Sequence, residues 1–365
     1  MTSTKETGLH LLDAPIQIVD FRSGSGVCPK LDPTAKILAV KQYHSDFGKV
    51  VGTTPRHSLL LSSEDTSMNP FFQNGCVWVS DGDQLYIMSD PLQPSNSSQL
   101  PVILISRVIL HRAPDDSITA VDWLKLRSPE NMVMPAGACR YKSGILYCSQ
   151  GNLCPELGGL SYMRLGRPPT SILYGYFGTP FNSIQNVIED LDGGLWFTDS
   201  DMGFERSIRP KPQLPNQVYR FDPKTNDLRV VADGFKKPAG IAISPNNDTL
   251  YITDIDAARP DGTTDRTRAA TIYAFDVTRR FGSQFLTNRR TFAFAKEGVP
   301  RAVMCDDLGI VYAACGDGVE VWSPGGVALG VIEVPGGCTT LCFGENRELF
   351  IGAKQRLWMI QLQDK

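Results

Sequence analysis

The sequence has little of what would point to nucleic acid or a membrane. Of its 365 residues, 36 are lysine or arginine and 39 are aspartate or glutamate, and the basic residues form no run. A chain without a concentrated positive charge is not expected to bind nucleic acid or an anionic membrane surface. No apolar run is long enough for a transmembrane helix. We therefore predict a small-molecule partner, with no nucleic acid and no membrane.

Histidine is scarce, and the cysteines are not paired in the manner of a zinc site. There are four histidines and nine cysteines, with no Cys-x-x-Cys motif, which argues against a zinc cluster. Cysteine in a strand is commonly a small core residue, and the pattern leaves room for one disulfide. The polar N-terminus does not resemble a signal peptide. Sequons at Asn96 and Asn247 slightly favour a secreted protein whose signal has been removed; otherwise we expect a cytoplasmic one.

What the sequence does contain is a repeat. Segments 184–199 and 238–254 both run from an apolar strand through an Asp/Asn/Gly turn into a second strand that ends in Thr-Asp. Such a pattern is typical of a hairpin. The turn-and-strand part occurs six times, starting at Asp81, Lys142, Asp192, Asn247, Asp307 and Asn346. Six copies at intervals of about 40 to 60 residues predict an all-β, six-bladed β-propeller. The alternative is an all-β sandwich with accidental similarity between its strands.

The last repeat leaves room for only three strands before the end of the chain. A propeller that does not close its ring exposes a strand edge. We therefore predict that an N-terminal strand, near 16–21 or 37–40, completes the sixth blade. The expected organisation is an N-terminal extension with the closing strand over residues 1–45, followed by a single propeller domain over 46–365.

The first strand of each blade runs beside the propeller axis, so the starts of these strands converge on one mouth of the channel. The residues predicted there are Asn74, Ala136, Gln185, Ala239, Arg301 and Thr339. The plain alternative is that they only pack the tunnel. Arg301 differs from the others because a buried guanidinium needs a partner or a ligand. The long loop after the third repeat carries Asp201, Met202 and Phe204, which could cover an apolar ligand.

Several of these segments resemble the SMP-30/gluconolactonase/LRE-like group, and in particular fungal lactonohydrolases. The resemblance rests on 181–183, 195–199, 214–223, 231–235 and 240–245. It is strong over about 180–256 and extends over 70–365. It implies a six-bladed propeller with one divalent metal on the axis, usually calcium, that activates a lactone for hydrolysis.

The sequence departs from this family at the metal ligands. Where the family supplies Glu, Asn, Asn and Asp, this chain has Asn74, Gln185, Ala239 and Arg301. A hard divalent cation needs several oxygen ligands, with carboxylates among them to neutralise its charge. This ring has no carboxylate, and Arg301 would repel the ion. We therefore expect no metal and no cofactor, and we expect the pocket to serve a different function from that of the family's metal site.

Three functions are compatible with such a pocket. The first is a metal-independent enzyme of fungal natural-product biosynthesis that catalyses a hetero-Diels–Alder cycloaddition of a quinone-methide-like intermediate with an apolar terpene. Fungal propellers of this kind are known among proteins that resemble lactonohydrolases. Its catalytic residues would be Arg301, Gln185 and Asn74. Its substrate contacts would be Met202, Phe204, Asp201, Ala239, Thr339 and Phe72.

The second function is a lactonase or related hydrolase that uses other ligands, and the third is a non-catalytic binding propeller. Candidate acids for the hydrolase are Asp199, Asp201, Asp254 and Asp256, although acids at strand ends commonly serve turns. No Ser-His-Asp order, nucleotide-binding loop or haem motif is present.

Overall fold

The computed structural model describes residues 5–8, 14–15, 17–20, 31–93 and 101–363. The protein is an all-β, six-bladed propeller, as predicted. In the described residues the α-helices are short: α1 (Phe47–Val51) and α2 (Met202–Glu205). None of the helices in these ranges could cross a membrane. The chain forms two compact units, one of which holds the described residues up to 90, 104–126 and 310 onward. The other holds 127–309 and the described part of 91–103.

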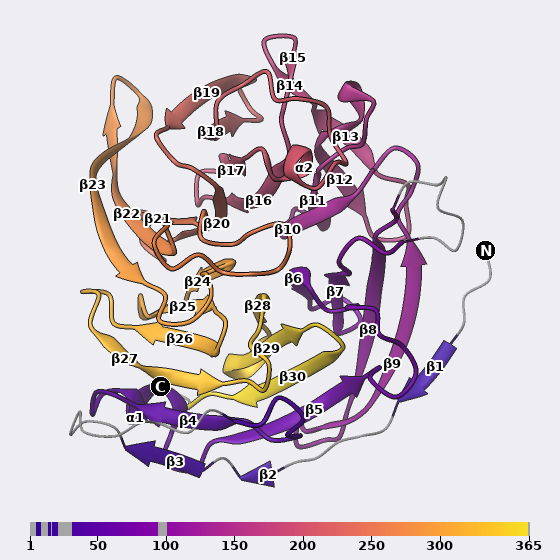
Figure 1. The fold of residues 1–365 in the computed structure, drawn as a ribbon, viewed down its shortest axis with the longest axis vertical. Helices are drawn as coiled ribbons and strands as arrows, with labels where there is room; N and C mark the ends of the chain where they lie inside the picture. Colours follow the sequence, from indigo (N-terminus) through magenta and orange to yellow (C-terminus); the bar gives the residue numbers. More distant parts are fainter. Residues whose placement is uncertain (1–4, 9–13, 16, 21–30, 94–100, 364–365) are drawn as a thin grey trace. The chain divides into compact units, whose positions relative to one another are not determined.

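The second unit contains three complete four-stranded antiparallel sheets (Figure 1). The first consists of β10 (Pro135–Tyr141), β11 (Gly144–Ser149), β12 (Gly159–Arg164) and β13 (Thr170–Leu173). The second consists of β16 (Ile184–Glu189), β17 (Leu195–Asp199), β18 (Gln217–Asp222) and β19 (Asp227–Ala232). The third consists of β20 (Pro238–Ile243), β21 (Thr249–Asp254), β22 (Thr271–Arg280) and β23 (Ser283–Phe294). A small hairpin, β14 (Gly175–Tyr176) with β15 (Thr179–Pro180), and the strand β24 (Ala302–Cys305) complete this unit.

The first unit contains the remaining sheets. One has the order β1-β9-β8-β7-β6 and comprises β6 (Asn74–Val79), β7 (Gln84–Met88), β8 (Leu104–Arg112), β9 (Ile118–Arg127) and β1 (Lys5–Gly8). Another has the order β2-β5-β30-β29-β28 and comprises β28 (Thr340–Phe343), β29 (Glu348–Ala353), β30 (Arg356–Gln361), β5 (Arg56–Ser62) and β2 (Ala14–Pro15). The third group comprises β25 (Val311–Ala314), β26 (Gly318–Trp322), β27 (Ala328–Glu333), β4 (Ala39–Gln42) and β3 (Gln17–Asp20).

The six predicted turns are confirmed, and each joins the first two strands of a blade. Every one of them contains a residue with a positive φ, between 46° and 87°. These residues are Asp83, Lys142, Gly193, Asn247, Gly309 and Asn346. Tight hairpins need such left-handed residues, which Gly, Asn and Asp tolerate best. The recurring Asp/Asn/Gly pattern therefore predicts the turns, because the backbone of a tight turn requires residues of this kind.

The closing strand exists, but its predicted position is wrong. Strand β5 pairs with β30, and its Leu59, Ser58 and His57 lie opposite Trp358, Met359 and Ile360. The segment near 37–40 instead contributes β4, which pairs with β27. In the segment 16–21, β3 pairs with β4 in parallel, while residues 16 and 21 lie outside the described residues. Three consecutive leucines, 59–61, are almost fully buried in β5, so the boundary at residue 45 precedes the strand that closes the sheet.

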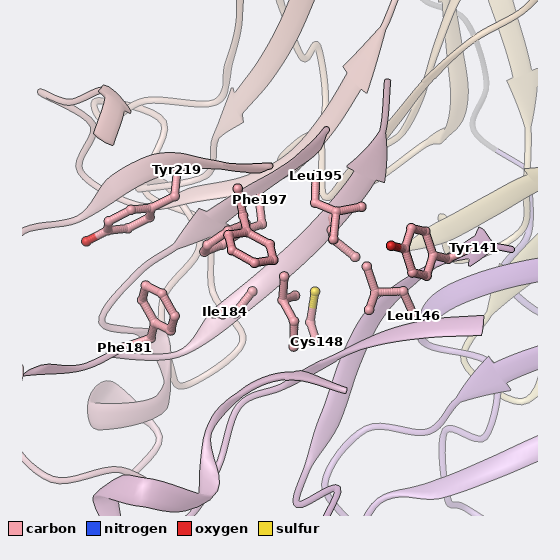
Figure 2. Packing of buried hydrophobic residues seen from close by; sticks show 11 residues of the cluster. Tyr141, Leu146, Cys148, Phe181, Ile184, Leu195, Phe197 and Tyr219 are labelled. Atoms are coloured by element: carbon pink, nitrogen blue, oxygen red, sulfur yellow. The ribbon is translucent and has the colours of Figure 1, made fainter. Parts of the chain in front are cut away.

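Adjacent blades of the second unit pack face to face through large apolar side chains. Phe181, Phe197 and Tyr219 form a three-ring contact with centroids 5.2–5.3 Å apart (Figure 2). Leu146 and Cys148 of the neighbouring sheet belong to the same cluster. Such contacts between neighbours hold a blade in place and fix where its first strand begins.

Candidate functional site

The predicted ring residues of the second unit lie at irregular positions of the first strands. Strand pairing shifts between Pro135 and Ala138 in β10, between Ile184 and Asn186 in β16, and between Pro238 and Ile241 in β20. The irregular stretches contain Ala136, Gln185 and Ala239. A β-bulge bends the strand and redirects a side chain, which is why bulges often occur beside active sites.

Two glycines bring these strand starts close together. A Cβ atom on Gly137 would lie 2.3 Å from the carbonyl oxygen of Gln185. A Cβ atom on Gly240 would lie 3.1 Å from the carbonyl oxygen of Arg301. The backbone after Ala136 therefore touches that of Gln185, and the backbone after Ala239 touches that of Arg301. The structure thus brings four sequence-predicted residues of the second unit together in two adjacent pairs.

The side chains at these strand starts are an unusual set. Ala136 and Ala239 are nearly buried, at 4% and 6% exposure, whereas Gln185 and Arg301 are partly exposed. The amide nitrogen of Gln185 donates to the carbonyl oxygen of Ser183 at 2.7 Å and to its hydroxyl at 3.0 Å. The set therefore offers two methyl groups, one oriented amide and one cation.

A buried arginine fixes the segment that leads into β16. The guanidinium of Arg209 donates to the carbonyl oxygens of Phe181 (2.7 Å) and Asn182 (2.8 Å). It also donates to Asn152 and Cys154, at 3.0 and 3.2 Å. Arg209 is only 3% exposed. The guanidinium group of arginine carries five N–H donors, which allows this one side chain to tie two loops together. Sequence reasoning missed this role because nothing in the pattern distinguishes Arg209 from Arg206.

Asp199 also holds the segment that leads into β16. Its carboxylate oxygens accept the backbone N–H groups of Asn182 (2.9 Å) and Ser183 (2.6 Å). Burial raises the pKa of Asp199 to about 7, although the two N–H groups and Arg209 act to lower it. In the next blade, Asp254 accepts the N–H groups of Lys236 and Lys237 in the same way, both at 2.9 Å.

The other two acids named for a hydrolase are also engaged. Asp256 forms an ion pair with Arg268 at 3.0 Å. Asp201 accepts a hydrogen bond from the side chain of Asn216 at 3.0 Å. All four acids thus have contacts that support turns and loops.

The predicted covering loop lies near the start of β20. Lys237, which directly precedes β20, pairs with Glu205 of α2 at 2.6 Å. Asn216 bridges Asp201 to the carbonyl oxygen of Lys236 at 2.6 Å. In this loop Met202 is 8% exposed and Phe204 is 46% exposed. Phe204 therefore has apolar surface available for a ligand, and Met202 has little.

The site residues predicted in the first unit have different surroundings. The side chain of Asn74 donates to the carbonyl oxygen of Ser89 at 3.4 Å. The hydroxyl oxygen of Thr339 is buried without a hydrogen-bond partner in the part of the chain that the structure describes. Phe72 is fully buried and packs 5.1 Å from Trp123 between ring centroids. Phe72 is thus a core residue in this structure, and its role as a substrate contact stays a prediction.

These residues do not fit the divalent metal that the family resemblance implies. The strand starts in the second unit carry Ala136, Gln185, Ala239 and Arg301, without a carboxylate to neutralise a cation. Across the described residues, no group of three or more His, Cys, Asp or Glu side chains is placed to hold a metal ion.

The class of protein is a β-propeller whose first strands are bulged and closely packed. Sequence comparison identifies the family. The chain belongs to the SMP-30/Gluconolactonase/LRE-like region family, whose model matches residues 169–355.

Two relatives carry the names lactonohydrolase and gluconolactonase. The chain is 27% identical over 299 residues to lactonohydrolase oryL of Aspergillus oryzae, a match that covers 77% of this chain and 64% of that protein. It is 26% identical over 339 residues to a gluconolactonase of Zymomonas mobilis, covering 86% of each. The chain thus spans just under two thirds of the length of oryL.

Solved structures confirm the fold. The gluconolactonase XC5397 of Xanthomonas campestris superposes with a TM-score of 0.68 at 24% identity, covering 93% of this chain and 99% of that one. Regucalcin of Agrobacterium tumefaciens, a calcium-binding protein, gives 0.56 at 14% identity, with 82% and 94% covered. At these identities the likeness extends to the fold alone.

Proposed function

We propose that this protein is a metal-independent enzyme that binds a small organic substrate at the starts of β16, β20 and β24. In this proposal the Arg301 guanidinium stabilises negative charge that develops on a substrate oxygen. The observation that carries it is the close packing of these strand starts. The backbone at Gly240 lies beside Arg301, and Thr198, which accepts the N–H of Asn186, donates to the carbonyl oxygen of Ala239. None of the side chains of Gln185, Ala239 and Arg301 is itself a carboxylate. A fixed cation at a site partly shielded from water is an efficient stabiliser of such charge.

The reaction we propose is a hetero-Diels–Alder cycloaddition of a quinone-methide-like intermediate with an apolar terpene alkene. The two new bonds form together, and no proton or electron has to be supplied. Such a step gains mostly from proximity and orientation. Arg301 would bind the quinone-methide oxygen, Gln185 would orient the ring, and Phe204 would cover the alkene. The roles of Asn74 and Thr339 remain predictions.

Lactone hydrolysis is the second candidate, and the names of the two relatives favour it. Water would add to the lactone carbonyl, the ring C–O bond would break, and a hydroxy acid would leave. Arg301 would then stabilise the oxyanion of the tetrahedral intermediate, a task that a carbonyl-polarising metal performs in other enzymes.

The test compares wild type with Arg301→Ala and Arg301→Lys on a quinone-methide precursor and on an aldonolactone. Loss of one charge-assisted donor is expected to lower kcat about 10²–10³-fold. Lysine should restore only part of the rate, because its ammonium is a point charge without the planar two-donor geometry of guanidinium. Arg167→Ala, which removes the same charge from an exposed turn, is the matched control and should keep wild-type turnover.

The two substrates separate the candidate reactions. Turnover of the precursor alone supports the cycloaddition, and turnover of the lactone alone supports the hydrolase. A folded Arg301→Ala variant with wild-type turnover on whichever substrate reacts would move the site away from Arg301.

A further inference from the structure

Two cysteines that are 266 positions apart in the sequence meet inside the first unit. The sulfur atoms of Cys76 in β6 and Cys342 in β28 lie 2.9 Å apart. This separation is shorter than the sum of two sulfur van der Waals radii, although both residues are free thiols in this structure. A disulfide bond brings sulfur atoms to about 2.0 Å. The two thiols therefore need only a small displacement to become bonded.

The backbone around this pair holds the two strands together. The N–H group of Cys76 donates to the hydroxyl of Thr340 at 3.0 Å. Cys342 lies in regular register opposite Phe350 of β29. Cys76 lies within the irregular stretch of β6, between Asn74 and Val77, where the pairing with β7 shifts. Both cysteines thus lie within strands and not in loops, Cys76 at the irregular stretch of β6 and Cys342 in the regular pairing of β28.

We propose that Cys76 and Cys342 form a disulfide that joins the first strand of the first blade to the first strand of the last. The oxidant is a small-molecule disulfide such as oxidised glutathione. One cysteine thiolate attacks it and releases one glutathione thiol, and the second cysteine then displaces the other. Two cysteine thiols are oxidised to one disulfide, and one glutathione disulfide is reduced to two thiols.

Burial decides when this bond forms. The exposed fractions of Cys76 and Cys342 are 7% and 4%. Burial, together with the neighbouring Cys76 thiol, raises the pKa of Cys342 well above its usual value. Because the thiolate is the attacking species, oxidation of the folded protein should be slow. Oxidation during refolding, before the strands are covered, should be fast.

The bond would close a loop that contains most of the chain. Restricting so long a loop lowers the conformational entropy of the unfolded chain, which stabilises the folded state. For a chain of this size we expect the unfolding midpoint of the oxidised protein to lie about 3–5 °C above that of the reduced protein.

The experiment refolds the full chain with a glutathione redox buffer or with excess dithiothreitol. The product is then alkylated in denaturant and its peptides are mapped by mass spectrometry without reduction. The expected result is a peptide pair linked through Cys76 and Cys342, with seven of the nine cysteines alkylated. Dithiothreitol should leave all nine alkylated.

Cysteine variants test which two residues form the disulfide and whether it raises the unfolding midpoint. Cys342→Ala and Cys76→Ala should lose the linked peptide and the difference between the oxidised and reduced midpoints. Cys315→Ala, which changes another buried cysteine of the same unit, should retain both. Should a variant fail to fold, the wild-type peptide map decides alone. Alkylation of both Cys76 and Cys342 after oxidative refolding, or a different linked pair, would overturn the proposal.

Discussion

At the scale of single residues, the carboxyl group of Asp199 links the stability of the candidate site to pH. Burial raises its pKa in the folded protein to about 7, against 3.8 for an ordinary aspartate. Between these values the folded protein binds more protons than the unfolded chain. The contribution of Asp199 to the free energy of unfolding is therefore full below about pH 4 and is lost as the pH rises toward 7.

Asp199→Asn should test this dependence. The advantage of wild type over the variant in free energy of unfolding should be larger at pH 5 than at pH 7.5. This difference in free energy of unfolding should change by at most about 1.4 kcal/mol per pH unit. Urea unfolding at both pH values measures it. A difference that is constant with pH would contradict the assignment.

Asp254→Asn is a control for the hydrogen bonds alone. In either variant an amide nitrogen would face a backbone N–H, at a cost of about 1–3 kcal/mol at a given pH. Comparable losses for the two variants at one pH would show that both aspartates support the segments before β16 and β20.

At the scale of elements, strand β5 should be essential because it is the fourth strand of the last sheet. Leu60 is fully buried in β5, whereas Ile37, just before β4, is 50% exposed. Leu60→Ala should cost about 2–5 kcal/mol, as expected for a large-to-small change in a core. Ile37→Ala, the matched control, should cost below about 1 kcal/mol. Denaturant unfolding measures both, and equal losses would exclude β5 from the stable sheet.

At the scale of the whole molecule, we expect neither stability nor turnover to depend on a bound divalent metal. The strand starts of the second unit carry Ala239 and Arg301 where the family resemblance implies the ligands Asn and Asp, and a hard cation would find no carboxylate at these two positions. Chelation with EDTA, followed by calcium, should therefore leave the unfolding midpoint and the rate unchanged. Elemental analysis before chelation provides the control. A stoichiometric metal whose removal abolishes activity would instead favour the lactone hydrolase.

Local features of the sequence determined the fold class and the six blade turns. A turn between two paired strands depends on a few adjacent residues, and those with positive φ, such as Asn247 and Gly193, are of types that tolerate this geometry. The starts of the first strands could be placed approximately from the same repeats, because each lies five to nine residues before the start of its predicted turn. The absence of carboxylates at these starts was equally visible in the sequence.

Only the tertiary structure decided which distant segments meet. Strand β5 has no turn signal to mark it, and its pairing with β30 arises from a buried leucine run packing at the far end of the chain. The roles of Arg209 and of the Cys76–Cys342 pair depend on contacts between loops and strands that are remote in sequence. The packing of Phe72 against Trp123 in the core is likewise a contact between segments that are distant in the sequence. Periodicity reports local backbone geometry, whereas such contacts depend on how the folded strands pack.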